Sequence, residues 1–287
     1  KTLGPDPTYQ VFHWLQFSGV CVEPDPVAFS KLRRNIPHER VKKVNAGMTP
    51  GQVPEFCEKY NVPQFPDIIK IDIDSFDCDL LEAFVRARQF KLIHTEINYE
   101  IPVPLMFARK WSPQIRFCMR PFAFYSCSFS YQVHMLSKYG YTLLQLWGFD
   151  ATFIHESVKH VFPENRYLDP VQYFYSTPKI NAGIEGKTTG HLKHPKRKWR
   201  WRANVMNGRM HLAWNSILEH YAEAATDCAG RKHEFKDYVS ALHQETGYHA
   251  LTSDVDFRNF TIRVLNKAEA DVFFKPMANA TPLPDAV

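Results

Sequence analysis

The sequence predicts an α/β protein with a doubly wound, mostly parallel sheet, an antiparallel edge hairpin and a mainly helical C-terminal extension. Strand and helix patterns alternate four times between residues 8 and 98, which is typical of a parallel sheet with helices on both faces. Two later strand patterns, 141–147 and 151–155, are joined by a turn of only three residues. Such a short connection predicts a hairpin, and therefore an antiparallel pair at the edge of the sheet.

The expected elements follow one another in a regular order. Apolar periodicity predicts helices over 8–17, 27–35, 52–60, 79–90 and 128–139, and strands over 20–22, 40–47, 66–74 and 91–98. The intervening segment 99–125 is rich in prolines and aromatic residues and is too long for a simple connector. We therefore expect a lid or a substrate-binding loop there.

Three regions are expected along the chain. Residues 1–160 form the α/β domain, residues 161–205 an irregular basic linker that contains tryptophans, and residues 206–287 a helical extension. Amphipathic patterns predict helices over 210–228 and 233–246, whereas 257–274 mixes strand and helix patterns.

The composition is that of a globular protein. Hydrophobic residues make up 45% of the chain, charged residues 23%, and the formal net charge is +5. No run of about 18 uncharged apolar residues is present, so we expect no membrane span. A soluble protein is predicted, with a cytoplasmic or organellar location favoured slightly over the secretory lumen.

The six cysteines form no CxxC pair, which argues against a zinc ribbon or a thioredoxin-type site. We expect most of them to be free thiols in the core. Two sequons, at Asn259 and Asn279, would permit glycosylation if the chain enters the secretory route.

An acidic residue closes the strand pattern 20–22. Glu23 is followed by Pro24, Asp25 and Pro26, after which a helical pattern begins. A carboxylate at the end of this strand of a doubly wound sheet can accept hydrogen bonds from both hydroxyls of a ribose. The alternative is a capping region for the next helix, and Asp25 suits that role.

Acids also end the next two central strands. Asp72 and Asp74 follow one strand pattern, and Glu96 and Asn98 follow its neighbour, each pair with i, i+2 spacing. Because ligands bind beyond the carboxyl ends of such strands, these side chains are candidates for a general base or for positioning a substrate. All four could also hold a divalent cation, which prefers oxygen ligands. Alternatively, the acids cap the following helices.

A dense basic run lies in the predicted linker. Five cations, Lys196, Arg197, Lys198, Arg200 and Arg202, are interleaved with Trp199 and Trp201 within the segment 191–202. Cations and aromatic rings together suit phosphate contact and base stacking. The segment could therefore bind nucleic acid or an acidic protein surface, or it could be a solvated connector.

Three blocks of the chain, 19–35, 67–77 and 94–98, resemble in order and spacing the successive blocks of FkbM-type methyltransferases. The resemblance covers residues 1–158 and implies a Rossmann-like fold. In that family a glycine-rich motif, Asp-x-Gly-Ala-x-Asp-Gly, ends a first strand immediately before a segment like Lys1-Thr2-Leu3. Residues 1–287 contain neither this motif nor that strand.

The resemblance implies a methyltransferase that uses S-adenosylmethionine (SAM). Glu23 would bind the cofactor ribose, and the turn Asn45-Ala46-Gly47 would lie near the adenine, with Pro24, Asp25 and Asp72 completing the cofactor site. Asp72, Asp74 and Glu96 would then serve the methyl acceptor, which family membership suggests is a small-molecule or sugar hydroxyl. The competing hypothesis is a non-catalytic subunit with this fold that binds nucleic acid or a protein assembly through its basic extension.

Overall fold

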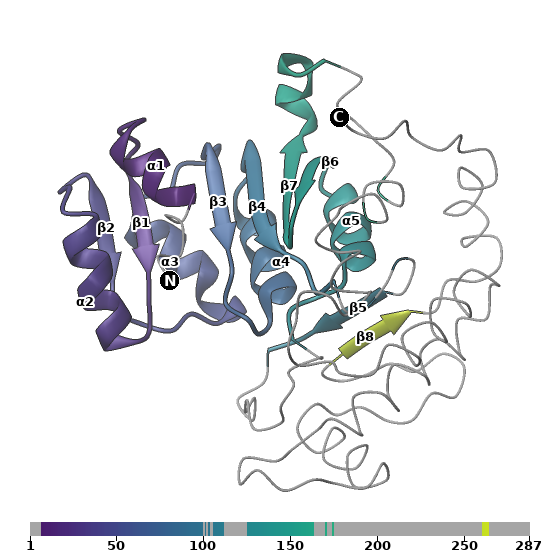
Figure 1. Cartoon of the computed structure of the whole chain (residues 1–287), viewed down its shortest axis with the longest axis horizontal. Helices are drawn as coiled ribbons and strands as arrows, with labels where there is room; N and C mark the ends of the chain where they lie inside the picture. The colour runs from purple at the N-terminus through teal and green to yellow at the C-terminus, as the bar shows by residue number, and fades with distance from the viewer. Residues whose placement is uncertain are drawn as a thin grey trace, which may run out of the picture.

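The computed structural model describes residues 7–99, 101, 103, 106–111, 125–163, 170, 174 and 260–263. Within them the chain forms a mixed α/β structure, as the alternation of strand and helix patterns predicts (Figure 1). No helix among these residues has the length and apolar character needed to cross a bilayer.

Two groups of strands form the central layer. β1 (Gly19–Val22) pairs in parallel with β2 (Val41–Val44), and β3 (Ile68–Ile71) pairs in parallel with β4 (Leu92–Glu96). The predicted hairpin is confirmed: β6 (Tyr141–Trp147) and β7 (Asp150–His155) are antiparallel, and β7 also runs antiparallel to β4. The four-stranded sheet has the order β3-β4-β7-β6, and Figure 1 shows the β1–β2 pair beside β3 with its strands pointing the same way.

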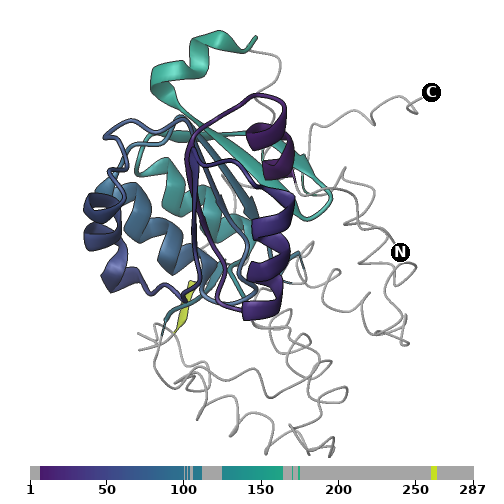
Figure 2. The same ribbon diagram turned by 90° about the vertical axis from the view of Figure 1, so that its left-hand side faces the viewer.

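Helices cover both faces of this layer. α1 (Pro7–His13) and α2 (Pro26–Asn35) lie on one face, whereas α3 (Val53–Lys59), α4 (Asp77–Ala87) and α5 (Phe129–Ser137) lie on the other (Figure 2). Two 3-10 helices, η1 (Pro50–Gln52) and η2 (Glu156–Val161), precede α3 and follow β7. The fully buried side chains of Leu81, Ile93 and Phe153 come from α4, β4 and β7, so the main core lies between the sheet and the α4 face.

The segment 99–125 contains a strand that the sequence did not indicate. β5 (Met106–Arg109) is buried at all four positions and pairs antiparallel with β8 (Phe260–Arg263). The part of the predicted C-terminal extension that the structure describes is therefore a strand paired with the α/β region. Phe174, from the predicted linker, is also fully buried and stacks on Phe129 of α5.

A disulfide joins Cys78, in the first turn of α4, to Cys127, just before α5. The expectation of free thiols is therefore wrong for these two residues, although Cys57 is a free thiol. The partners are 49 residues apart in the chain, with Cα atoms separated by 6.0 Å and both side chains buried. Cys118 and Cys228 lie outside the described residues.

Candidate functional site

The carboxyl ends of the four parallel strands lie at one edge of the central layer. Figure 1 shows β1, β2, β3 and β4 pointing toward this edge. Glu23 follows β1, Asn45 follows β2, Asp72 follows β3, and Glu96 is the last residue of β4. The sequence-predicted cofactor and acceptor residues therefore share this edge, where ligands bind in open α/β sheets.

Hydrogen bonds join the residues that follow β1 and β2, Glu23 and Asn45, and hold the Glu23 carboxylate. The Asn45 side-chain amide donates to the carbonyl oxygens of Glu23 (2.7 Å) and Pro24 (3.2 Å). The backbone N–H of Asp25 donates to Oε1 of Glu23 over 2.9 Å, and the Glu23 side chain is half-buried. No bond from the described residues engages Oε2, so one carboxylate oxygen of a held side chain is open to a ligand.

The other predicted cofactor residues have simpler surroundings. Pro24, Ala46 and Gly47 are exposed, and a Cβ atom added to Gly47 would meet nothing within 4 Å. Asp25 is the N-cap of α2, because its Oδ1 accepts from the Ala28 N–H over 2.6 Å. The capping alternative is therefore confirmed for Asp25, whereas the Glu23 carboxylate accepts from the N–H of this cap residue rather than from an N–H of α2.

Three of the predicted acids come together. One carboxylate oxygen from each of Asp72, Asp74 and Glu96 lies within 4.8 Å of the others. Because β3 ends at Ile71, the alternation of side chains along a strand does not bring Asp72 and Asp74 together. Asp74 instead lies in the loop after β3 and adopts a left-handed backbone conformation (φ 53°). Asp is among the residues that tolerate this conformation best. Lys70 forms an ion pair with Asp72 over 3.0 Å and offsets part of the negative charge.

The cluster holds a proton on Glu96. Burial, together with the negative charges of Asp72 and Asp74 and a hydrogen bond to Asp74, raises the pKa of Glu96 to about 9. A protonated Glu96 can donate to the Asp74 carboxylate, which relieves the repulsion between the two groups. Oε2 of Glu96 is buried and has no hydrogen-bond partner among the described residues, so part of this carboxyl group is unsatisfied.

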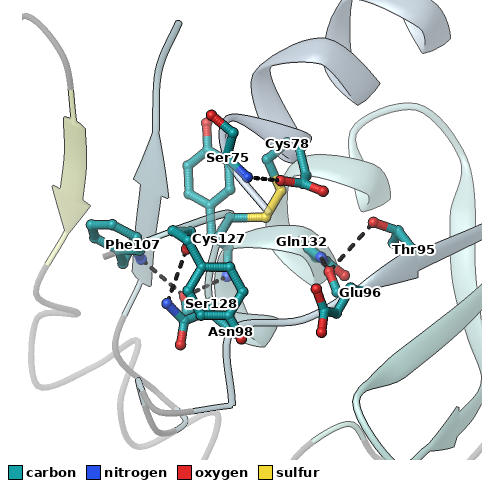
Figure 3. Close-up of a disulfide and its surroundings, with 12 residues drawn as sticks. Ser75, Cys78, Thr95, Glu96, Asn98, Phe107, Cys127, Ser128 and Gln132 are labelled. Atoms are coloured by element: carbon teal, nitrogen blue, oxygen red, sulfur yellow. Dashed lines mark hydrogen bonds between the residues drawn. A yellow bond between two sulfur atoms is a disulfide. The ribbon is translucent and has the colours of Figure 1, made fainter. Parts of the chain in front are cut away.

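Asn98 turns away from the three acids. Its side-chain amide donates to the carbonyl of Tyr125 over 2.9 Å, and its backbone N–H donates to the carbonyl of Cys127. Figure 3 shows Asn98 beside Ser128, whereas Glu96 lies near Gln132. The structure therefore assigns Asn98 a role in anchoring the segment that carries the disulfide, and no described contact joins it to the acid cluster.

The acids after β3 do not cap α4 as the capping alternative expected. The N-cap of α4 is Phe76, which makes no side-chain capping bond. Asp77 is fully buried and accepts from the backbone N–H groups of Ile73 (2.8 Å) and Ser75 (2.9 Å), so it shapes the loop that carries Asp72 and Asp74. Burial raises the pKa of Asp77, while these backbone hydrogen bonds oppose the rise.

Sequence reasoning missed Gln132 of α5. Its side chain is fully buried, and Nε2 donates to the backbone carbonyl of Glu96 over 2.6 Å, which fixes the end of β4 (Figure 3). A glutamine in helical register with the apolar residues Phe129, Met135 and Leu136 was the available signal, because buried polar side chains usually have a specific partner. The basic run 196–202 lies outside the described residues.

Comparisons of the chain with protein-family models, with curated proteins and with solved structures found no match.

Proposed function

We propose that the chain is a SAM-dependent methyltransferase that methylates a hydroxyl group of a small molecule or sugar. The observation that carries the proposal is the gathering, at one edge of the sheet, of a held carboxylate just after β1 and an acid cluster formed by the loop after β3 and the last residue of β4. The first suits a ribose, and the second suits an acceptor whose proton must be removed.

The division of the central layer supports a Rossmann-like fold. β1 and β3 each pair along one edge only among the described residues, and Figure 1 shows their other edges facing each other. α1 and α2 cover the same face (Figure 2), so a right-handed crossover into β1 would start from a strand on the β3 side of β1. A strand from outside the described residues would then lie between β1 and β3. Counted with that strand as the first, the parallel strands would have the order 3-2-1-4-5 that is typical of these sheets.

The residues after β1 and β2 fit the ribose and adenine parts of the cofactor. Oε2 of Glu23 can accept from a ribose hydroxyl, and the open space beside Gly47 leaves room for a planar base. Asn45 contributes by holding the two strand ends together. Bound SAM would supply the activated methyl group, and the protein would contribute mainly position and exclusion of water.

Asp72, Asp74 and Glu96 would receive the proton of the acceptor hydroxyl. With a pKa of about 9, ionised Glu96 is a stronger base than an ordinary carboxylate and is better matched to a hydroxyl group. The ionised fraction grows as the pH rises toward this value. We therefore expect the rate of transfer to increase between pH 7 and pH 9.

A divalent cation is the alternative occupant of the cluster. Three carboxylate oxygens within 4.8 Å of one another suit its preference for oxygen ligands. The ion pair between Lys70 and Asp72 and the proton on Glu96 already reduce the repulsion, which favours the state without a cation. Equal transfer rates with and without a chelator would support that state, whereas loss of transfer that Mg²⁺ or Ca²⁺ restores would support the cation.

Calorimetric titration of the full-length protein with SAM tests the proposal. We expect saturable binding that weakens at least about tenfold in Glu23→Gln, because a neutral amide accepts hydrogen bonds from hydroxyls less strongly than a carboxylate. Glu39→Gln is the matched control, because Glu39 is exposed and precedes β2 at the opposite edge of the sheet. Absence of binding by the full-length protein, or equal weakening in both variants, would overturn the proposal.

The buried disulfide also bears on the compartment. Disulfides persist in oxidising environments and are rare in the cytosol, so we infer that the protein matures in an oxidising compartment. The sequons at Asn259 and Asn279 are compatible with the secretory route. Mass spectrometry after thiol alkylation of the protein from its native cells should find Cys78 and Cys127 unalkylated unless a reductant is added first. Alkylation without reduction would contradict the inference.

A further inference from the structure

A hollow of about 490 Å³ lies between α2 and β2. It is lined by Phe29 and Arg33 from α2, Pro37 from the following loop, and Lys43 from β2. Phe29 and Arg33 are four residues apart and therefore share one face of the helix. The volume is within the range of sites that take small organic ligands.

The two cations of this hollow have no carboxylate partner among the described residues. Nζ of Lys43 donates to the backbone carbonyl of His38 over 2.6 Å, which orders the side chain without neutralising its charge. Arg33 forms no ion pair or hydrogen bond with the described part of the chain. An anion that enters the hollow would therefore meet two available positive charges.

The surroundings add to the positive field. Arg40 donates to the backbone carbonyls of Phe12 (2.6 Å) and Phe17 (3.2 Å), so its charge is not neutralised either. Nε2 of His38 is buried and has no hydrogen-bond partner in the part of the chain that the structure describes. Burial, followed by the charges of Arg40, His13 and Lys43, lowers the pKa of His38. These positive charges act together on this side of the molecule.

We propose that this hollow binds a small organic anion, with its oxyanion held by Arg33 and Lys43 and its apolar or planar part packed against Phe29 and Pro37. The guanidinium group of Arg33 can donate two parallel hydrogen bonds to a phosphate, sulfate or carboxylate, whereas Lys43 supplies a point charge. The ring of Phe29 can pack against the apolar part of an organic anion, a contact that inorganic phosphate cannot make. None of the four lining residues belongs to the proposed cofactor or acceptor site, so the assignment does not depend on methyl transfer.

Calorimetric titration of the full-length protein with phenyl phosphate tests this assignment. We expect saturable binding, at least about tenfold tighter than that of inorganic phosphate, and a loss of at least about tenfold in both Arg33→Gln and Lys43→Gln. Arg34→Gln is the matched control, because it removes the same charge from the next residue of α2, which does not line the hollow. Equal affinity for the two phosphates, or an equal loss in the control, would overturn the assignment.

A second measurement on the unaltered protein covers the case in which a variant fails to fold. We expect phenyl phosphate to slow acetylation of the Lys43 amine by an amine-reactive reagent at least about fivefold, because a bound oxyanion would cover this amine. Acetylation of Lys42, the exposed neighbour in β2 that does not line the hollow, should be unchanged. Equal rates for Lys43 with and without phenyl phosphate would overturn the proposal.

Discussion

Removal of the disulfide is expected to cost the protein a large share of its stability. Cys78 and Cys127 close a loop with a sequence separation of 49. In the chain-entropy treatment, a cross-link over a loop of this length stabilises the folded state by about 4 kcal/mol. A typical domain is stable by only about 5 to 15 kcal/mol, so the double variant Cys78→Ala/Cys127→Ala should be close to unfolding at physiological temperature.

The structure indicates where the loss acts. Two hydrogen bonds hold the segment with Cys127 (Figure 3). The backbone N–H of Asn98 donates to the carbonyl of Cys127, and the N–H of Phe107 donates to Oγ of Ser128 over 2.9 Å. Cys78 lies in the first turn of α4, directly after the loop with Asp72 and Asp74. The disulfide therefore ties the acidic loop to β5 and to the start of α5.

Guanidinium denaturation followed by circular dichroism measures this contribution. Cys57→Ala is the control for truncating a buried thiol, because Cys57 is free and fully buried. After twice the cost of that control is subtracted, we expect the double variant to be about 4 kcal/mol less stable than the oxidised wild type. A remaining difference below about 1 kcal/mol would refute the view that the cross-link stabilises the fold.

Three further outcomes are expected. The wild type should lose stability as the pH rises from 4.5 toward about 9, because only its folded state holds the Glu96 proton, whereas Glu96→Gln should lack this loss. Between pH 5 and pH 8, the free energy of unfolding of the variant should therefore rise relative to that of the wild type by about 1 to 2 kcal/mol after allowance for solvent screening, as measured by denaturation at both pH values. Equal pH slopes would contradict this. Asp25→Ala should cost about 1 kcal/mol by thermal or chemical denaturation through loss of the α2 cap, whereas Asp25→Asn should retain most of it. If the basic run binds nucleic acid, fluorescence anisotropy with an RNA oligonucleotide should give an affinity that falls steeply with salt and is lost when its cations are replaced by Gln; a salt-insensitive affinity would argue against this role. The cations are Lys196, Arg197, Lys198, Arg200 and Arg202.

The edge of the sheet could be predicted from the sequence because local patterns determine it. β1 and β3 are mainly apolar, β2 and β4 mix apolar and polar residues, and a polar side chain stands at or just after the end of each strand. Glu23, Asn45, Asp72 and Glu96 were therefore expected at the same end of the sheet. The cap of α2 was also visible, since Asp25-Pro26 is a local signal for a helix start. These predictions required no knowledge of long-range pairing.

The parts that the sequence did not indicate depend on distant partners. β5 lies among prolines and pairs with β8, which is far along the chain, so no local periodicity indicated it. The partners of the disulfide are separated by 49 residues and carry no spacing signal. The side chain of Asn98 was expected beside that of Glu96, but the contact of the strand end with residues 125–128 turned it toward Tyr125.

The most direct test of the account is a crystal structure of the full-length protein with S-adenosylhomocysteine, the product that SAM leaves after transfer. We expect the Glu23 carboxylate to lie within hydrogen-bond distance of the ribose hydroxyls, with the sulfur facing Asp72, Asp74 and Glu96. A nucleoside bound elsewhere on the molecule, or a Glu23 side chain directed into bulk water beside a bound nucleoside, would contradict it.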